Sequence, residues 1–106
     1  MSEIHYHVPV LVDQVLHHLP TLCHDIIDGT LGHGGHTLHM IHHLHHLHQH
    51  VHIYGFDRDQ DMISKAEQQL QSCINQVTIL HDTYQEIHKY IADHIIPSPD
   101  VILLDL

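Results

Sequence analysis

Apolar residues along the chain follow two alternating patterns, short continuous runs and longer stretches with helical spacing. Four short runs predict strands, at residues 23–28, 51–57, 77–81 and 100–106. Four longer stretches predict helices, at residues 9–20, 35–49, 60–72 and 84–94. Strands that alternate with helices form a parallel sheet with helices on both faces. We therefore expect an α/β fold with about four strands, one for each short apolar run.

The helical stretches each carry apolar residues at three- and four-residue spacing, which predicts their buried faces. In the second stretch these residues are Leu38, Ile41, Leu44 and Leu47. In the third they are Met62, Ile63, Ala66 and Leu70, and in the fourth Ile87, Tyr90, Ile91 and Ile95. The last strand is apolar without alternation over residues 101–104, which is typical of a strand buried on both sides.

A glycine-rich segment, residues 28–36 (DGTLGHGGH), separates the first predicted strand from the helix that follows it. Glycine tolerates positive φ and lets a ligand approach the backbone, so this segment favours a cofactor loop over an ordinary turn. Asp57 ends the second predicted strand, where nucleotide-binding folds place an acid that holds the ribose hydroxyls. The alternative is that Asp57 caps the next helix.

The charge balance limits the partners of this segment. Thirteen acidic residues stand against three basic ones, and the formal net charge is −10 with 18 neutral histidines. An acidic surface repels phosphate backbones, so this segment alone is a poor nucleic-acid binder. No apolar run reaches membrane-span length and no signal peptide is recognisable. With only Cys23 and Cys73, we expect a reducing, cytoplasmic setting.

Histidines are concentrated in residues 33–52, where ten of twenty residues are histidine. On a helix, pairs such as His42 and His46 share a face and can chelate Zn²⁺, Ni²⁺ or Cu²⁺. No Asp, Glu or Cys lies between residues 33 and 52, although dedicated sites usually include one. The interpretation we favour is a solvent-exposed face without a dedicated metal site.

Four motifs occur in order: residues 7–11 (HVPVL), 28–37 (DGTLGHGGHT), 55–59 (GFDRD) and 102–106 (ILLDL). Together they resemble the bacterial ribosomal RNA small subunit methyltransferase H family, also called MraW. The resemblance implies a Rossmann-like class I methyltransferase fold with S-adenosylmethionine as cofactor. It also implies methylation of N4 of a cytosine in the 16S rRNA decoding centre, on the small ribosomal subunit.

The resemblance also implies a set of cofactor-binding residues: Gly34, Gly35, His36, Asp57, Tyr84 and Asp105. Gly34, Gly35 and His36 would contact the methionine end of the cofactor, and Asp57 would hold the ribose hydroxyls. Tyr84 would lie beside the adenine, where the family usually has phenylalanine, and a phenol ring stacks nearly as well. Asp105 would complete the pocket near the reacting end. Asp28 would shape the loop or touch the amino group of the cofactor.

The resemblance covers the whole chain but only about the first third of a family member. We expect residues 1–106 to be the N-terminal cofactor-binding part of a longer methyltransferase domain. The catalytic residues would then lie beyond Leu106, and this part alone would be inactive. The fourth strand would lie beside the first, with an exposed apolar edge. Two alternatives remain, a histidine-rich metal-binding or interaction module and a nucleotide-dependent oxidoreductase.

Overall fold

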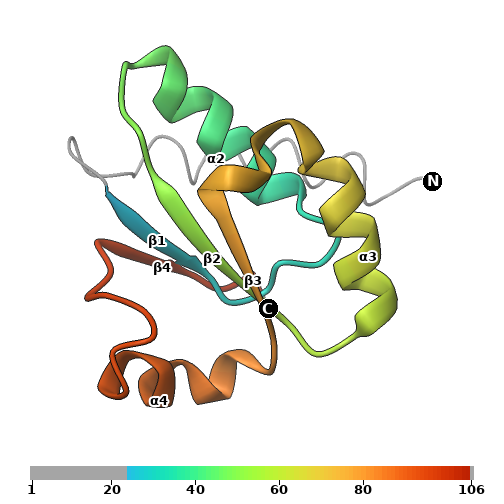
Figure 1. Ribbon diagram of the computed structural model, residues 1–106, viewed down its shortest axis with the longest axis vertical. Coiled ribbons are helices and arrows are strands. Elements are labelled where there is room, and N and C mark those ends of the chain that lie inside the picture. Colours follow the sequence, from blue (N-terminus) through green and yellow to red (C-terminus); the bar gives the residue numbers. More distant parts are fainter. Residues whose placement is uncertain (1–23, 106) are drawn as a thin grey trace.

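The computed structural model describes residues 24–105. Within that range four parallel strands form one sheet in the order β3-β2-β1-β4, as Figure 1 shows. The strands are β1 (Asp25–Asp28), β2 (His52–Asp57), β3 (Val77–His81) and β4 (Val101–Leu103). The helices are α2 (Gly35–His46), α3 (Gln60–Gln69) and α4 (Ile87–Ala92), with short 3₁₀ helices η1 (Gln71–Gln76) and η2 (Tyr84–Glu86). The helix predicted at residues 9–20 lies outside the described residues.

Helices cover both faces of the sheet, which confirms the predicted α/β architecture. Helices α2 and α3 lie on one face and α4 on the other (Figure 1). Neighbouring residues of β1 point to opposite faces, so Ile26 packs in the core under α2 and α3. Ile27 packs with Phe56 and Ile87 in the core under α4. None of the helices among residues 24–105 is long and apolar enough to cross a membrane.

The buried face of α2 differs from the predicted one. Leu47 is 50% exposed, whereas Met40, which lies off the predicted stripe, is buried with Ile41 and Leu44. A helix has 3.6 residues per turn, so a stripe repeating every third residue drifts around the axis and leaves the core. The helix also ends at His46 rather than Gln49.

The other two helices are shorter than predicted. Helix α3 ends at Gln69 and continues as η1, and the predicted helix over residues 84–94 divides into η2 and α4. Because α4 ends at Ala92 and His94 adopts a positive φ of 59°, the chain leaves the helical path there. As a result Ile95 is 55% exposed and Ile96 is buried instead.

Strand β4 lies beside β1 at one edge of the sheet formed by residues 24–105, as the resemblance implied. The prediction that it is buried on both sides is wrong for the described residues, because Ile102 is 48% exposed and Leu104 42%. A strand at the edge of a sheet has a neighbouring strand on one side only, so its side chains have fewer neighbours on both faces. A continuous apolar run therefore does not guarantee burial. The apolar edge expected to be exposed over residues 101–106 is confirmed at Ile102 and Leu104, whereas Val101 and Leu103 are half-buried.

Candidate functional site

The glycine-rich loop connects the carboxyl end of β1 to the first turn of α2. Gly32 and Gly34 adopt positive φ values of 55° and 91°, so the loop needs glycine at both positions. Gly34 is the residue that caps the N-terminus of α2. A Cβ added to Gly34 would lie 3.0 Å from Cδ1 of Leu70, just beyond the end of α3. The loop therefore folds tightly against the helix layer on that side.

Asp57 fixes this loop to the end of β2. Its Oδ2 atom accepts a hydrogen bond from the backbone N–H of Gly32 (3.0 Å), and its Oδ1 accepts one from the N–H of Asp59 (2.9 Å). Asp57 does not cap the next helix, because the N-cap of α3 is Asp59, whose side chain accepts from the N–H of Asp61. Asp57 is half-buried, so its carboxylate remains accessible from outside.

A hollow of about 350 Å³ lies where β1, β2 and β3 end, the place where open parallel sheets bind ligands. The residues that line it are Gly29, Thr30, Gly32, Phe56, Asp57, Arg58, Asp82, Thr83, Tyr84 and Gln85. Two of the predicted site residues, Asp57 and Tyr84, are among them. Asp57 ends β2 and Tyr84 begins η2, which follows the neighbouring strand β3, and the structure brings both to one hollow.

Several lining residues were not predicted. Asp82 follows β3 as Asp57 ends β2, and its carboxylate accepts hydrogen bonds from the N–H of Thr83 (2.7 Å) and the hydroxyl of Tyr90 (2.9 Å). These two bonds, the first more than the second, lower the pKa of the Asp82 carboxyl below its usual value. An acid directly after a predicted strand was the available signal. Thr30 had no such signal.

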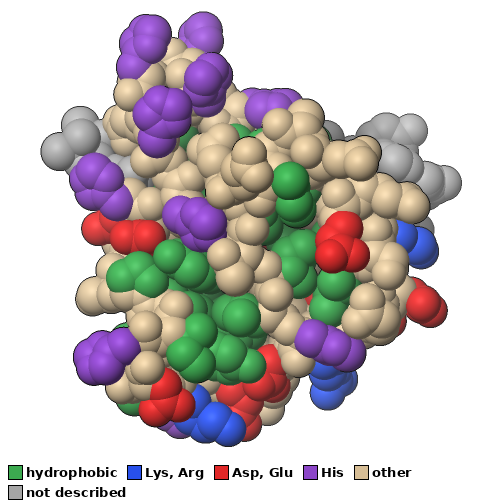
Figure 2. All heavy atoms as spheres, in the orientation of Figure 1, with side chains coloured by type: hydrophobic (Ala, Val, Ile, Leu, Met, Phe, Trp, Pro, Cys, Tyr) green, Lys and Arg blue, Asp and Glu red, His purple; other side chains and the backbone are tan. Residues whose placement is uncertain are grey.

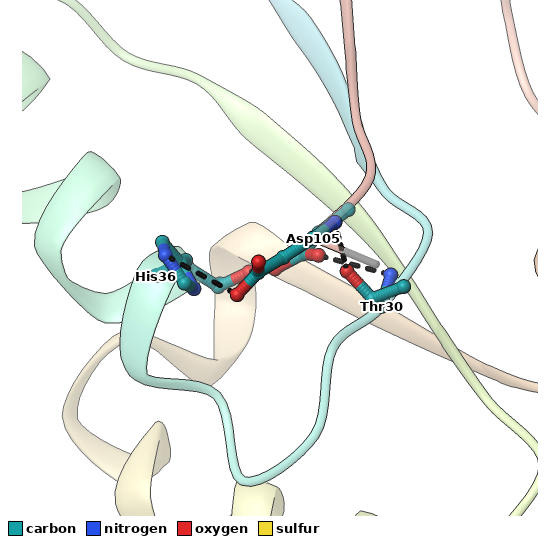
Figure 3. A network of polar contacts seen from close by, with 5 residues as sticks. Thr30, His36 and Asp105 are labelled. Carbon is teal, nitrogen blue, oxygen red and sulfur yellow. Dashed lines mark hydrogen bonds and ion pairs between the residues drawn. The ribbon is translucent and has the colours of Figure 1, made fainter. Parts of the chain in front are cut away.

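The other four predicted residues lie beside the hollow rather than in its lining. Gly34 and Gly35 are buried at the start of α2. His36 and Asp105 approach each other, with 3.9 Å between Nε2 of His36 and Oδ2 of Asp105, an ion-pair distance when the ring is protonated. Figure 3 shows Asp105 between His36 and Thr30. The hydroxyl of Thr30 accepts a hydrogen bond from the backbone N–H of Asp105 (2.8 Å).

Asp28 is fully buried beneath the loop. Its carboxylate accepts hydrogen bonds from the hydroxyl of Thr37 (2.8 Å) and the backbone N–H of Thr30 (3.2 Å). Burial raises the pKa of the Asp28 carboxyl above its usual value, against the lowering effect of these two bonds. Asp28 therefore shapes the loop from inside, as the resemblance implied, and is not exposed to a ligand.

Histidine side chains gather at the end of the molecule formed by the last turns of α2 and the loop after it, as Figure 2 shows. The exposed ones there are His42, His45, His46, His48 and His50. The rings of His45 and His50 meet edge to face with centroids 6.0 Å apart. Residues 24–105 include no group of three or more His, Cys, Asp or Glu side chains placed to hold a metal ion.

The chain is similar over its full length to curated bacterial proteins. It is 33% identical over 107 residues to the ribosomal RNA small subunit methyltransferase H of Citrifermentans bemidjiense and covers 33% of that protein. It is 31% identical over 108 residues to the protein of the same name from Dictyoglomus turgidum and covers 36% of it. The chain thus spans about a third of the length of these relatives.

Solved structures share the fold. A Clostridium thermocellum protein matches 79% of this chain with a TM-score of 0.66 and 22% identity, and the match covers 44% of that protein. An rRNA methylase from Streptococcus thermophilus matches 78% with a TM-score of 0.60 and 19% identity, over 43% of its length. These likenesses confirm the Rossmann-like sheet. The sequence pattern of one family, the MraW methylase family, matches residues 4–106, and the chain belongs to that family.

Proposed function

We propose that this chain is the S-adenosylmethionine-binding, N-terminal part of a methyltransferase domain, and that the complete protein methylates ribosomal RNA. The observation that carries the proposal is the hollow at the ends of β1, β2 and β3, with Asp57 and Tyr84 in its lining. An acid and an aromatic ring from neighbouring strand ends are what a ribose and an adenine require. Membership of the MraW methylase family supports the same conclusion.

The residues present fit an adenosyl group. Asp57 accepts two backbone N–H bonds, and a carboxylate has about four acceptor directions, so it retains capacity for the two ribose hydroxyls. Tyr84, which lines the hollow, would supply an aromatic ring for stacking on the adenine. The hollow, at about 350 Å³, has the size of a small-molecule site. Asp57 therefore has two functions, since it fixes the glycine loop and holds the ligand.

The methionine end of the cofactor would lie toward the start of α2. The first-turn N–H groups of this helix favour the carboxylate of the ligand. Asp105, whose carboxylate lies 3.9 Å from Nε2 of His36, would accept hydrogen bonds from the amino group. Gly34, with a φ of 91°, gives this turn the backbone conformation that begins α2.

When bound, S-adenosylmethionine supplies a methyl group on a positively charged sulfur. The contribution of this chain is to hold and orient that group, because in-line transfer depends on aligning two reactants. We propose N4 of a cytosine in the 16S rRNA decoding centre as the acceptor, on the small ribosomal subunit. The resemblance implies this acceptor, and the names of the relatives, ribosomal RNA small subunit methyltransferase H, support the coarser statement that the substrate is ribosomal RNA. We assign no catalytic residue within residues 24–105.

Titration of the chain with S-adenosylmethionine in a calorimeter tests the binding proposal. Asp57→Asn removes the charge but keeps one acceptor oxygen for the Gly32 N–H, and we expect affinity to fall about tenfold or more, as for a charged hydrogen bond. Asp61→Asn is the matched control, because Asp61 is exposed on α3 and does not line the hollow. The proposal fails if the unaltered chain does not bind, or if both variants bind equally well.

We also propose that this chain alone does not transfer methyl groups to RNA. Its length is about a third of that of the relatives, and its formal net charge of −10 opposes contact with phosphate. With radiolabelled S-adenosylmethionine and small ribosomal subunits, we expect no label in the RNA above background. Repeated turnover by the 106-residue chain would contradict this.

A further inference from the structure

Thr30 connects two parts of the fold that are distant in sequence. Its hydroxyl oxygen accepts a hydrogen bond from the backbone N–H of Asp105, two residues past the end of β4 (2.8 Å, Figure 3). Its own backbone N–H donates to Oδ1 of Asp28 at the end of β1 (3.2 Å). Thr30 also lines the hollow. One residue therefore touches the candidate site and joins the ends of two neighbouring strands.

Asp105 lies beyond the part of β4 that pairs with β1. The pairing of β1 with β4 ends at Leu103, whose carbonyl accepts a hydrogen bond from the N–H of Gly29 (2.9 Å). Beyond that point the strand lies at the edge, and the side chain of Asp105 is 41% exposed. The bond to Thr30 places the Asp105 backbone so that its carboxylate lies 3.9 Å from Nε2 of His36.

Thr30 is itself held by residues of β1 and α2. Asp28, which accepts from the Thr30 N–H, is fully buried and also accepts from the hydroxyl of Thr37 in α2 (2.8 Å). The backbone of Thr30, from which the hydroxyl extends, is thus held by β1 and α2 together. A polar group supported in this way holds its partner more accurately than one on a mobile loop does.

We propose that Thr30 is a positioning residue, which fixes Asp105 against His36 and so completes the methionine side of the cofactor site. The proposal rests on the proposed function, because it assigns Asp105 to the cofactor. Thr30 acts through Asp105, and loss of its hydroxyl leaves the ring and ribose contacts of Tyr84 and Asp57 in place.

Amide hydrogen exchange tests the placement without any ligand. In Thr30→Val, which keeps the branched shape but lacks the hydroxyl, we expect the Asp105 amide to exchange about three- to tenfold faster, the size of one hydrogen bond. Thr30→Ser keeps a hydroxyl, so its Asp105 amide should exchange as slowly as in the unaltered chain. Thr78→Val is the matched control, because it removes a hydroxyl in contact with His52 Nε2 (2.7 Å) on β3, away from the site. Unchanged exchange at Asp105 in Thr30→Val overturns the placement.

A double-mutant cycle tests the effect on the cofactor. Measured by calorimetry, Thr30→Val should weaken S-adenosylmethionine binding about three- to tenfold, and Thr30→Ser and Thr78→Val by less than about twofold. In an Asp105→Ala background, Thr30→Val should have no further effect, because the group it positions is gone. If Thr30→Val weakens S-adenosylmethionine binding by the same factor with and without Asp105→Ala, the inference is overturned and the proposed function stays intact. If the unaltered chain does not bind, the proposed function fails, and the exchange result still decides the placement.

Discussion

Two aspartates at neighbouring strand ends, Asp28 and Asp57, have opposite surroundings. Asp28 is fully buried and holds Thr30 and Thr37, whereas Asp57 is half-buried and lines the hollow. In the sequence both are acids at the end of an apolar run, Asp28 just before Gly29 and Asp57 two residues after Gly55. Their burial depends on which elements pack over them, so only the structure separates the residue that shapes the loop from the residue that can meet a ligand.

Asp28→Asn tests the buried carboxyl. Its pKa in the folded state is raised above its usual value of 3.8, so the folded chain binds the proton more tightly than the unfolded chain. The stability this provides is complete below pH 3.8 and is lost as the pH rises through the folded pKa. Asparagine can accept from the Thr30 N–H and donate to the Thr37 hydroxyl, and it does not titrate.

The stability of Asp28→Asn relative to the unaltered chain should therefore increase with pH. Urea unfolding of both proteins at several pH values between about 4 and 7 measures this difference. Titrating groups that do not interact with Asp28 contribute alike to both proteins, whereas His36 and Asp105 interact with it electrostatically. A difference that stays constant across this range would show that Asp28 has an ordinary pKa in the folded chain.

At the scale of elements, the four strands and the three α-helices within residues 24–105 were predictable, and most of their ends were not. Residues 77–81 form a strand with the predicted bounds, because a run of β-branched and apolar residues between polar ones is a local signal. The end of α2, the break at His94 and the exposure of Leu47 depend on packing and on backbone turns. Likewise, the contact of Thr30 with Asp105 joins residues 75 positions apart, which no local pattern shows.

Gly34→Ala tests the junction of the loop with α2 and α3. The φ of Gly34 is 91°, and the new Cβ would lie 3.0 Å from Cδ1 of Leu70, so strain and crowding add. We expect a loss of about 2–4 kcal/mol in the free energy of unfolding, measured with urea. Gly32→Ala is the control, because Gly32 has a φ of 55° but its Cβ would come no closer than 3.7 Å to Met62. The free energy of unfolding of Gly32→Ala should fall by about 1–2 kcal/mol. Equal losses would contradict the packing argument.

At the scale of the whole molecule, the sheet has two different borders. Its carboxyl ends form the hollow, and its β4 edge exposes Ile102 and Leu104 among the described residues. The histidine-rich end of α2 is a third region of the surface (Figure 2). An edge strand with exposed apolar residues can pair with another chain, so this edge is expected to govern the association of the 106-residue chain.

Ile102→Lys tests the exposed edge. Ile102 is 48% exposed, so lysine can direct its charge into solvent with little cost to the fold, while charges on an edge strand oppose pairing between chains. Sedimentation or size-exclusion measurements over a range of concentrations should show that the unaltered chain associates and that Ile102→Lys remains monomeric. A stable monomer of the unaltered chain at all concentrations would contradict the expectation.

The central claim is that the ends of β1, β2 and β3 hold S-adenosylmethionine. Mapping amide chemical shifts of the 106-residue chain during titration with this ligand tests it most directly, because the position of the bound ligand is read residue by residue. We predict saturable shifts concentrated at Gly29, Thr30, Asp57 and Tyr84, and none confined to the histidine-rich end of α2. No shifts in the hollow, together with saturable shifts at His45 and His50 on adding Zn²⁺ alone, would contradict the claim and favour a metal-binding module instead.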